Sequence, residues 1–578
     1  MKTKFIVVAG GVISGVGKGV TTASLGKILQ KYGYKVTLIK IDPYINYDAG
    51  TLRPTEHGEV WVTHDGGEID QDLGTYERFI NADISKTNNI TTGQIYKTVI
   101  DRERAGHYLG QTVQFVPHIL DEIKQRILVA SQGYDFAIVE LGGTVGDYEN
   151  TPFLFALKSL EREIGSEHMA YCLVTYLPVP DHAPEMKTKP TQQAIRLLGQ
   201  EGILPDFIIC RAKYALDEAR KKKIESSAYV SSDNVICAPD IETVYEMPLY
   251  FEQEKLGLKI LNHFKMTPLQ NPDWTRWTEL VNAIKHPNGT VNIAIIGKYL
   301  ESGDYNLTDS YLSIYQALVH AAAHQNIGFK IDWINAQDFE KNKEAVACLS
   351  KYDGIIIPGG FGNAGVEGKI AAIEYARVNQ IPLLGLCYGL QLAVVEYARN
   401  VAGLTDAHTT EVNPTTPYPV VTLLEMQRKV MDERSFGGTM RLGDYQAIIN
   451  PSSHVAQLYN AHEQLHQDEQ GNYLVHERHR HRYEVNPQYT QQLQQAGLHF
   501  SGYYVREDNT MLMEFIELLE HPFFIATQAH PEFKSRLEQA HPLFQGFVEA
   551  CRHQALLSIA DNVCDVFVSH AAEQEIVI

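Results

Sequence analysis

Cys387 has the most reactive setting of any residue in this sequence. It follows an apolar run at Ile381 to Leu386 and precedes a segment of helical character at Gly389 to Arg399. A strand, a sharp turn and a helix with a thiol at the turn place the sulfur at a helix N-terminus, which favours the nucleophilic thiolate. Gly385 and Gly389 provide the backbone freedom that such a turn needs. The stretch therefore predicts a nucleophilic cysteine.

A cysteine nucleophile also needs a base, because a free thiol is mostly un-ionised at neutral pH. The candidate is His530, which stands two positions before Glu532 in the stretch Gln528 to Phe533. This spacing suits a base and the carboxylate that orients it. A small core residue is the common explanation of a lone cysteine, but it does not account for the glycines or for the His-x-Glu pair. These residues resemble the triad of class I glutamine amidotransferases, which implies Cys387 as nucleophile, His530 as base and Glu532 as orienter, with release of ammonia from glutamine.

Length and composition limit the classes of protein. A chain of 578 residues is too long for one core and predicts two to four domains. The net charge of −20 disfavours general binding to nucleic acid or to anionic membranes, and we expect no membrane span. The seven cysteines are scattered without a C-x-x-C pair, which indicates neither a zinc site nor a disulfide scaffold. The expected compartment is the cytosol.

A glycine-rich loop near the N-terminus predicts a second site. Gly10 to Gly19 (G-G-V-I-S-G-V-G-K-G) follows an apolar strand at Phe5 to Ala9 and precedes a helix at Val20 to about Lys31, with the next strand at Lys35 to Ile41. Backbone N–H groups and a helix N-terminus in this setting hold phosphates, and Lys18 would add a charge on the β- and γ-phosphates. The spacing is one residue longer than a Walker A motif, and glycine replaces its final Ser or Thr. We predict nucleotide binding, with a structural glycine turn as the alternative.

A bound nucleoside triphosphate needs Mg²⁺, which typically takes one or two protein carboxylates plus phosphate oxygens. Asp72 lies in Gly66 to Gly74, and Glu140 ends an apolar strand at Asp135 to Val139 beside a glycine turn. Doubly wound sheets place ligand contacts at such strand ends. A solvated loop acid is the alternative for each carboxylate.

Two basic stretches suggest a second anionic substrate. Lys187 to Gln192 (K-T-K-P-T-Q) gathers two amines, two hydroxyls and an amide in one loop, and Lys221 to Lys223 is a basic cluster in an acidic chain. A solvated charged face is the alternative for both.

The second half reads as another α/β domain. Asn271 to Thr290 is rich in proline, tryptophan and polar residues and is predicted to be the interdomain linker. Strands alternating with helices then predict a mostly parallel sheet. Pro358 to Gly362 (P-G-G-F-G) closes one strand and suits an oxyanion hole, with a simple tight turn as the alternative. The expected elements are strands at Val291 to Ile296, Phe329 to Trp333 and Gly354 to Ile357, and a helix near Ser310 to Ala323.

From Lys4 to about Ala550 the chain resembles the CTP synthase family. No single stretch identifies the family, but the matching stretches and an amidotransferase triad on the same chain are together highly specific. The matching stretches are Gly10 to Gly19, Ile41 to Asn46, His57 to Val60, Asp70 to Gly74, Tyr76 to Phe79, Gly142 to Asp147, Lys187 to Gln192 and Gly437 to Gly443.

The resemblance implies two α/β domains. Residues 1–270 form a synthetase domain with a P-loop-type, dethiobiotin-synthetase-like parallel sheet, 271–290 a linker, 291–555 a class I glutamine amidotransferase sheet, and 556–578 a tail. The implied enzyme is a glutamine-hydrolysing, C–N bond-forming ligase of pyrimidine biosynthesis. ATP phosphorylates the C4 oxygen of UTP, and ammonia from glutamine crosses an internal tunnel and displaces the phosphate to give CTP. The resemblance also implies Mg²⁺ with ATP, allosteric activation by GTP, feedback inhibition by CTP, and a cytoplasmic homotetramer assembled from dimers without nucleic-acid or membrane partners.

The resemblance also implies roles for individual residues. Glutamine is bound by Gly360, Tyr388, Gly389, Leu390, Gln391, Glu411 and Arg482. ATP is bound by Gly15, Val16, Gly17, Lys18, Gly19, Val20, Asp72, Asp240 and Ile241. UTP or CTP is bound by Ser14, Asp147, Tyr148, Glu149, Lys187, Thr188, Lys189, Pro190, Thr191, Gln192 and Lys223. Asp72 and Glu140 hold Mg²⁺, and Lys40 stabilises the phosphoryl transfer.

The chain departs from the family pattern at several positions, which bear on the strength of CTP inhibition. The departures are Ser14 to Val16, Thr51 to Pro54, Tyr148, Gln193 and an apparent insertion at Glu301 to Asn306. Three other functions are alternatives. The Lys187 to Gln192 loop and the intact His–Glu pair argue against a cobyrinate amidase-like ligase. A partition-type ATPase switch would leave everything after residue 290 unexplained, and the triad, the phosphate loop and the metal carboxylates argue against a filament-forming protein without catalysis.

Overall fold

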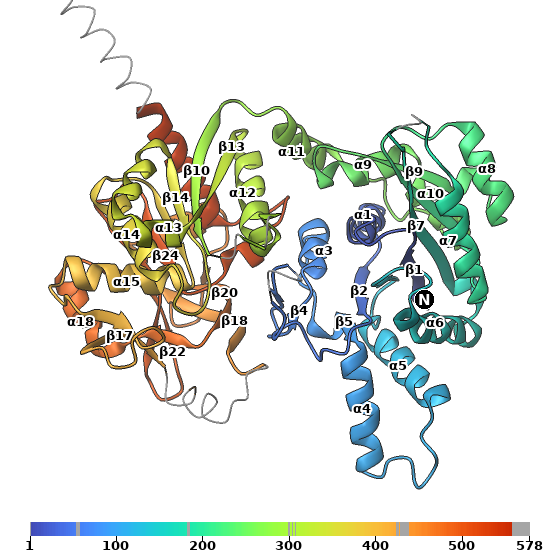
Figure 1. Ribbon diagram of the computed structural model, residues 1–578, viewed down its shortest axis with the longest axis horizontal. Helices are drawn as coiled ribbons and strands as arrows, with labels where there is room; N and C mark the ends of the chain where they lie inside the picture. The colour runs from blue at the N-terminus through green and yellow to red at the C-terminus, as the bar shows by residue number, and fades with distance from the viewer. Residues whose placement is uncertain are drawn as a thin grey trace, which may run out of the picture. The chain divides into compact units, whose positions relative to one another are not determined.

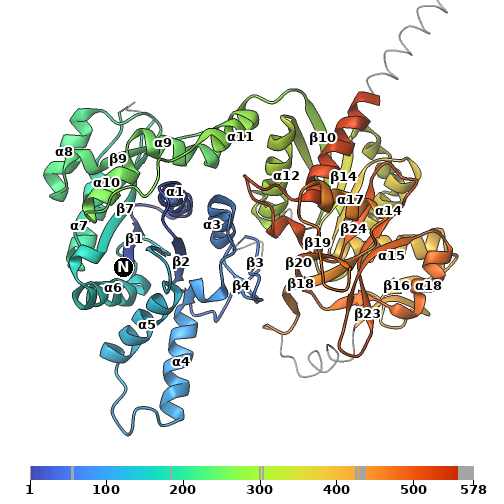
Figure 2. The same ribbon diagram turned by 180° about the vertical axis from the view of Figure 1, so that it is seen from behind.

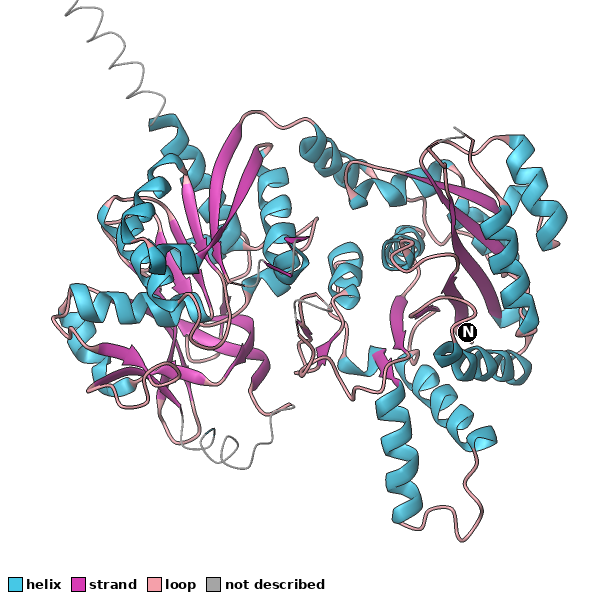
Figure 3. Cartoon of the chain, viewed as in Figure 1, coloured by secondary structure: helices cyan, strands magenta, loops and turns pink. Residues whose placement is uncertain are grey.

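The computed structural model describes residues 2–53, 58–181, 185–298, 301–302, 305–306, 308–423, 427 and 438–557. The chain separates into two compact units (Figure 1). Unit 1 contains Met1–Thr51 and Gly67–Val281, and unit 2 contains Leu52–Gly66 and Asn282–Ile578. Each unit is an α/β fold with its own sheet (Figure 3). No helix in the described ranges is long and apolar enough to cross a membrane.

Unit 1 is built on a seven-stranded sheet of order β5-β2-β6-β1-β7-β8-β9 in which each neighbouring pair is parallel. Its strands are β1 (Lys4–Gly10), β2 (Val36–Asp42), β5 (Asn89–Thr91), β6 (Phe136–Leu141), β7 (Met169–Leu177), β8 (Phe207–Ala212) and β9 (Val235–Pro239), with the short β4 (Glu68–Ile69) outside the sheet. Its helices are α1 (Lys18–Lys31), α3 (Asp72–Ile80), α4 (Thr92–Arg104), α5 (Leu120–Ala130), α6 (Thr151–Ile164), α7 (Lys189–Gln200), α8 (Glu218–Ala228), α9 (Met247–Gln253), α10 (Leu256–His263) and α11 (Thr275–Lys285). The parallel N-terminal sheet predicted from the sequence is confirmed.

The strands of this sheet are buried on both faces. In β1, Phe5 and Val7 belong to the core that contains α5 and α6, whereas Ile6 and Val8 are equally buried outside that core. Because successive strand residues point to opposite faces, the second pair faces the helices on the other side, among them α1 (Figures 1 and 2). Burial on both faces explains the uninterrupted apolar run of β1, which is typical of parallel sheets.

Two boundaries in unit 1 differ from the sequence prediction. β6 continues to Leu141, so Glu140 lies inside the strand, directly opposite Lys40 of β2. An ion pair between the two side chains allows a charge there. The predicted loop at Lys187–Gln192 ends early, because α7 begins at Lys189 with Pro190 in its first turn. Proline is favoured there because the first helical N–H has no partner within the helix.

Unit 2 contains a ten-stranded sheet of order β13-β10-β14-β15-β24-β23-β22-β18-β20-β19. Its strands are β10 (Thr290–Gly297), β13 (Gly328–Asn335), β14 (Gly354–Ile357), β15 (Leu383–Leu386), β18 (Arg441–Ile449), β19 (His466–Gln467), β20 (Tyr473–His481), β22 (His499–Val505), β23 (Met511–Glu517) and β24 (Phe524–Thr527). Smaller strands are β3 (Trp61–Val62), β11 (Glu301–Ser302), β12 (Tyr305–Asn306), β16 (Ala407–Thr409), β17 (Tyr418–Leu423) and β21 (Tyr483–Val485). Its helices are α12 (Leu312–Gln325), α13 (Ala336–Lys341), α14 (Val366–Val378), α15 (Tyr388–Asn400), α17 (His454–Ala461), α18 (Pro487–Gln495) and a last helix at 542–557.

The prediction of a mostly parallel sheet in this half was wrong for one side of the sheet. The strands from β13 to β24 are parallel, but those from β24 to β19 pair antiparallel. Strands β22 and β23 are joined by a short turn, as are β19 and β20. Antiparallel pairing permits such turns, whereas a parallel pair needs a long crossover.

Helices cover both faces of the parallel half (Figure 2). Ala294 and Ile296 of β10 lie in a core with α14 and α15. Ile293 and Ile295 lie in a second core with α12 and the helix at 542–557. The carboxyl ends of β14, β15 and β24 therefore meet at one edge between two packed helix layers, where ligands bind in open α/β sheets.

Residues 52–66 belong to unit 2 although they precede most of unit 1 in the sequence. Trp61 is fully buried, with its ring 4.9 Å from that of Phe533 between centroids. Arg478 is also fully buried and donates from Nη1 to the carbonyl of Val62 at 3.0 Å. These contacts fix the segment against the region that follows β24.

Several segments singled out in the sequence need separate mention. Within the predicted linker, α11 buries Trp277, whose indole N–H donates to the carbonyl of Tyr245 at 2.8 Å. In the apparent insertion, β11 and β12 form an antiparallel pair. His57, Gly437 and the tail from Ser558 onward lie outside the described residues.

Candidate active sites

Cys387 forms the turn between β15 and α15, with φ 51° and ψ −99°. A positive φ is strained for a non-glycine residue and persists only where the surroundings enforce it. Here the Cys387 N–H donates to the carbonyl of Thr527 at 2.7 Å. A Cβ on Gly389 would lie 2.3 Å from the carbonyl oxygen of Ile357, and one on Gly385 would lie 2.7 Å from the Cβ of Ala526. The two glycines therefore permit the close packing that holds the turn.

The structure brings the predicted triad together. β15 and β24 are parallel neighbours, so Cys387 and the segment with His530 follow the same edge of the sheet. His530 Nδ1 donates to Glu532 Oε1 at 2.6 Å, and both side chains are buried. A Cβ on Gly359 would lie 2.9 Å from His530 Cε1 and 3.6 Å from the Cβ of Cys387. The loop after β14 therefore borders both the thiol and the imidazole.

The surroundings of His530 favour its protonated form. Burial alone would lower the pKa of His530, but Glu532 and Cys387 outweigh burial and raise its pKa to about 10. The ring also stacks on Phe533 with centroids 5.0 Å apart. A protonated imidazole beside a thiol favours an imidazolium–thiolate pair, in which the imidazolium can donate its proton to departing ammonia.

Glu532→Gln is expected to lower kcat for glutamine hydrolysis by about 10²-fold, because the imidazole loses the carboxylate that orients and charges it. Loss of Glu532 also lowers the pKa of His530, so the imidazolium disappears at a lower pH. The alkaline limb of kcat/KM for glutamine should therefore move to lower pH. The measurement is ammonia release at a series of values from about pH 6 to about pH 10. An unmoved limb would contradict this role of Glu532.

Side chains hold the loop Pro358–Gly362 in place through hydrogen bonds to its backbone. Lys298 Nζ, at the end of β10, donates to the carbonyl of Phe361 and to that of Gly362 at 3.2 Å. Tyr388 Oη also donates to the Gly362 carbonyl, at 3.1 Å. The N–H of Gly362 donates to Glu411 Oε1 at 2.6 Å. Gly360 thus lies in a restrained turn whose Gly359 borders the thiol, and an oxyanion hole needs such fixed backbone groups.

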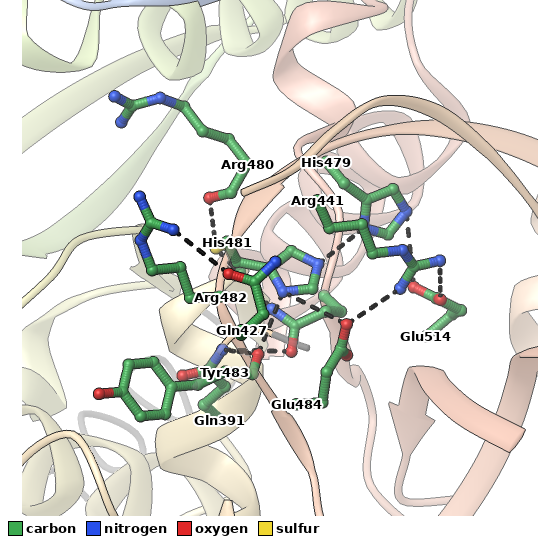
Figure 4. A network of polar contacts seen from close by, with 12 residues as sticks. Gln391, Gln427, Arg441, His479, Arg480, His481, Arg482, Tyr483, Glu484 and Glu514 are labelled. Atoms are coloured by element: carbon green, nitrogen blue, oxygen red, sulfur yellow. Dashed lines mark hydrogen bonds and ion pairs between the residues drawn. The ribbon is translucent and has the colours of Figure 1, made fainter. Parts of the chain in front are cut away.

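Two other glutamine-site candidates, Gln391 and Arg482, have several polar partners (Figure 4). Gln391 Nε2 donates to the carbonyl of Tyr483 at 2.9 Å and to Gln528 Oε1 at 3.2 Å. Arg482 Nη1 donates to Thr439 Oγ1 at 3.0 Å, which orients its guanidinium. Leu390 is fully buried in the core, and only its backbone is placed near the turn.

Strand β20 ends in a stretch rich in histidine and arginine, Arg478 to Arg482, whose side chains take part in a polar network (Figure 4). His479 Nδ1 and His481 Nε2 are 3.1 Å apart, and burial together with Arg441 lowers the pKa of both imidazoles well below the usual range. Arg441 Nη2 lies 2.6 Å from Glu514 Oε1, and burial raises the pKa of Glu484 to about 8. No group of three or more His, Cys, Asp or Glu suited to a metal occurs in the described part of the chain.

In unit 1 the glycine-rich loop joins β1 to α1. Gly15 and Gly17 adopt φ of 71° and 96°, which side chains rarely allow. Lys18 Nζ donates to the carbonyl of Gly143 at 2.6 Å. A Cβ on Gly10 would lie 2.8 Å from Lys18 Cδ, and one on Gly19 would lie 2.9 Å from Asp72 Oδ1. Glycine at these positions therefore lets the lysine and the carboxylate approach the loop. Val16 is buried, whereas Ser14 is exposed and Val20 is partly exposed.

Lys40 contacts both carboxylates predicted to bind Mg²⁺, Asp72 and Glu140. Its Nζ lies 2.9 Å from Glu140 Oε1 and also contacts Asp72 Oδ2. Burial lowers the pKa of Lys40, but Asp72 and Glu140 outweigh burial and raise it well above the usual range. Tyr76 Oη donates to Glu140. Hard carboxylate oxygens that converge on one positive charge are the donor set that Mg²⁺ prefers.

The sequence did not indicate two charged residues near these sites, Arg211 beside the glycine-rich loop and Asp42 beside Lys40. A Cβ on Gly17 would lie 3.3 Å from Arg211 Nη1, and Arg211 Nη2 lies 3.5 Å from Asp240 Oδ1. The arginine thus lies between the loop and the Asp240–Ile241 segment predicted to contact adenine. Asp42 is buried near Lys40, and burial raises its pKa to about 6. Their position could have indicated them, because each is a charged residue near the carboxyl end of an apolar strand, Arg211 in β8 and Asp42 in β2.

The two basic stretches meet at a cavity of about 350 Å³. Gln192 Nε2 donates to the carbonyl of Lys223 at 3.5 Å. Thr191 is fully buried and its hydroxyl pairs with that of Thr175 at 3.0 Å, so it secures the start of α7. The cavity is lined by Glu185, Met186, Lys187, Thr188, Lys189, Gln192, Ala219, Arg220 and Lys223.

Asp147, Tyr148 and Glu149 do not line that cavity. Asp147 Oδ2 accepts from the N–H of Thr144 at 2.6 Å, and Tyr148 is 89% exposed. Tyr148 and Glu149 line a separate, apolar cavity of about 580 Å³ that also includes Tyr96 and Phe115. Within one chain, the candidates for the UTP or CTP site therefore fall into two groups.

Comparisons with known proteins identify the family of each half of the chain. A family model described as CTP synthase N-terminus matches residues 4–266, and one described as glutamine amidotransferase class-I matches residues 306–550. A CTP synthase of Thermococcus gammatolerans is 49% identical over 552 residues, which cover 96% of this chain and 99% of that protein. A CTP synthase of Pyrococcus furiosus is 50% identical over 550 residues, covering 95% and 98%. Among solved structures, the Trypanosoma brucei CTPS glutaminase domain with bound acivicin is 36% identical, with a TM-score of 0.40, over 46% of this chain and 94% of that chain.

A nucleotide-type phosphate loop and a class I amidotransferase domain on one chain define a glutamine-dependent ligase. The chain belongs to the CTP synthase family. It is an ATP-dependent ligase that aminates UTP with nitrogen from glutamine, the final step of CTP synthesis. The family assignment removes the cobyrinate-type ligase, the ATPase switch and the non-catalytic filament protein from consideration.

Proposed function

We propose that the reaction is divided between the two sites described above. In unit 2, Cys387 attacks the carboxamide carbon of glutamine, His530 passes the proton to the departing ammonia, and water then hydrolyses the thioester. In unit 1, the C4 oxygen of UTP attacks the γ-phosphorus of ATP, and ammonia displaces the resulting phosphate to give CTP. Phosphorylation matters because phosphate leaves readily, whereas an oxide does not. The hydrogen-bonded His530–Glu532 pair beside Cys387 carries the proposal for the nitrogen-donating half.

CTP formation from UTP, ATP, Mg²⁺ and glutamine tests the whole proposal. The absorbance change from uracil to cytosine should depend on all four components. A second run without UTP shows whether ATP is hydrolysed alone. ATP hydrolysis without any CTP would contradict the proposed reaction.

We propose that Asp72 and Glu140 hold Mg²⁺ together with the ATP phosphates. The positions of these carboxylates around the Lys40 ammonium support this assignment. Mg²⁺ there would neutralise phosphate charge. Lys40 would remain close enough to stabilise charge on the transferred phosphoryl group, and Lys18 would orient the phosphates.

We propose that the 350 Å³ cavity binds UTP. Its lysines and the N-terminus of α7 suit a triphosphate, because both supply positive charge and N–H donors. Asp147–Glu149 and the apolar cavity beside them would complete a site for UTP or for the inhibitor CTP where subunits meet. Exposed apolar side chains nearby, at Phe115, Val116 and Phe155, favour a homotetramer assembled from dimers. GTP activation and a cytosolic location are proposed from the family resemblance, with the free thiols of the described cysteines supporting a reducing compartment.

Lys223→Met is expected to raise KM for UTP by about tenfold or more, because a phosphate contact with a lysine is charge-assisted. KM for glutamine should change by less than about twofold, since that site lies in the other unit. Lys222→Met, which removes the neighbouring charge outside the cavity lining, is the matched control. Equal effects of both substitutions would show that only general surface charge matters.

A further inference from the structure

Lys369 is a fully buried lysine that the chemistry above does not use. It lies near the start of α14 and has no exposed surface. A Cβ on Gly368 would lie 1.8 Å from the carbonyl oxygen of Ala336, so the first turn of α14 is packed directly against the start of α13. This close packing fixes the backbone from which the Lys369 side chain extends. Burying an amine is costly unless its N–H groups find hydrogen-bond acceptors.

The Lys369 amine contacts the loop Pro358–Gly362, the candidate oxyanion hole, which is called the oxyanion loop below. Its Nζ donates to the carbonyl of Pro358 at 3.0 Å, within the buried core. It lies 5.8 Å from the centroid of the Tyr388 ring, in the range of a cation–π contact. Across the described ranges of the chain, Lys369 forms no ion pair with a carboxylate. The lysine is therefore placed for the loop rather than for an acidic partner.

Holding the Pro358 carbonyl sets the direction of the next N–H. In a trans peptide the C=O and the following N–H point in opposite directions. With its oxygen turned toward Lys369, the Pro358–Gly359 peptide turns the N–H of Gly359 away from the lysine. Gly359 is the residue at which an added Cβ would lie 2.9 Å from His530 Cε1 and 3.6 Å from the Cβ of Cys387. The other end of the loop is held separately, by Lys298 and Tyr388 at the Gly362 carbonyl.

The setting of Lys369 disfavours its charge. Burial and then Lys298 lower the pKa of Lys369 well below its usual range, and Cys387 acts in the opposite direction. A neutral amine still carries N–H groups, so the hydrogen bond to Pro358 does not depend on the charge of the lysine.

We propose that Lys369 is a positioning residue of the glutamine site: it orients the Pro358–Gly359 peptide so that the loop N–H groups face the oxyanion. The inference rests on the proposed role of Cys387 as nucleophile. It assigns a function to a side chain that does not touch the substrate. The chemical signature is a loss in kcat rather than in KM, because the oxyanion exists only after attack.

Lys369→Met keeps the length of the side chain and removes the donor. Glutamine hydrolysis should lose about 10- to 100-fold in kcat, less than the 10²- to 10³-fold cost of deleting an oxyanion donor outright. KM for glutamine should stay within about threefold, since ground-state contacts are retained. A general packing defect in the site would raise KM as well as lower kcat.

Lys369→Gln retains a donor for Pro358, so it should lose less kcat than Lys369→Met. Lys351→Met is the matched control, because that lysine also lies over a tyrosine ring (Tyr352, 4.9 Å) in unit 2. Ammonia-dependent CTP formation reports on unit 1 and should be unchanged in all three variants.

If Lys369→Met does not fold, Lys369→Gln decides, with a kcat below about half of the parent value expected. A kcat within about twofold of the parent, or a KM that rises in step with the loss of kcat, would overturn the proposal. Failure of the parent enzyme to hydrolyse glutamine would instead overturn the proposed function.

Discussion

Cys387→Ala should abolish glutamine-dependent CTP formation, with a loss of at least about 10³-fold, while ammonia-dependent formation stays within about twofold of the parent rate. The thiol is the atom that forms the thioester, so no neighbouring group replaces it. The small side chain should fit the turn, because the Cys387 N–H bond to Thr527 is made by the backbone. The measurement is CTP formation with glutamine and, separately, with ammonium chloride at alkaline pH, where free ammonia is present.

The comparison of nitrogen donors makes this test specific. Ser535→Ala is a suitable control, because it removes a buried hydroxyl of unit 2 that bonds His320 rather than the triad. It should leave the ratio of glutamine-dependent to ammonia-dependent rates unchanged. A folded Cys387→Ala protein that makes no CTP from ammonia would show that the two reactions are not separable. Retained glutamine-dependent synthesis would show that another residue is the nucleophile.

The nucleophile and its turn could be predicted because their signal is local. An apolar run, a thiol and two glycines within Ile381–Arg399 specify a strand, a tight turn and a helix. The glycines have no room for a Cβ in the folded chain, so the local sequence reports the local packing. The distance between Cys387 and His530 carries no such signal. It follows from the pairing of β15 with β24, which is a property of the whole sheet.

The residues that escaped prediction act through long-range packing. Lys298 and Lys369 contact the oxyanion loop from β10 and α14, and nothing in their own sequence neighbourhood indicates this. Trp61 joins unit 2 through a buried contact with Phe533, far away in the sequence. The strand end at Glu140 was misplaced for the same reason, because its charge is neutralised by a lysine on the neighbouring strand. Sequence periodicity cannot foresee a partner that is distant along the chain.

Lys18→Met should have the opposite pattern to Cys387→Ala. CTP formation is expected to fall by at least about 10²-fold with either nitrogen donor, because the lysine charge on the ATP phosphates is needed for the phosphoryl transfer that precedes amination. Basal glutamine hydrolysis, measured without nucleotides, should stay within about twofold, since Lys18 lies in the other unit. The measurement is CTP formation from both donors beside glutamate release.

Lys27→Met provides the matched control on the same helix. Lys27 is also buried on α1, but its ammonium lies over the ring of Trp277 at 4.9 Å and away from the glycine-rich loop. If burial of a lysine on α1 were all that mattered, both variants would lose activity equally. If the phosphate loop binds ATP, Lys18→Met alone should lose synthesis, and its KM for ATP or its kcat should change while that of Lys27→Met does not.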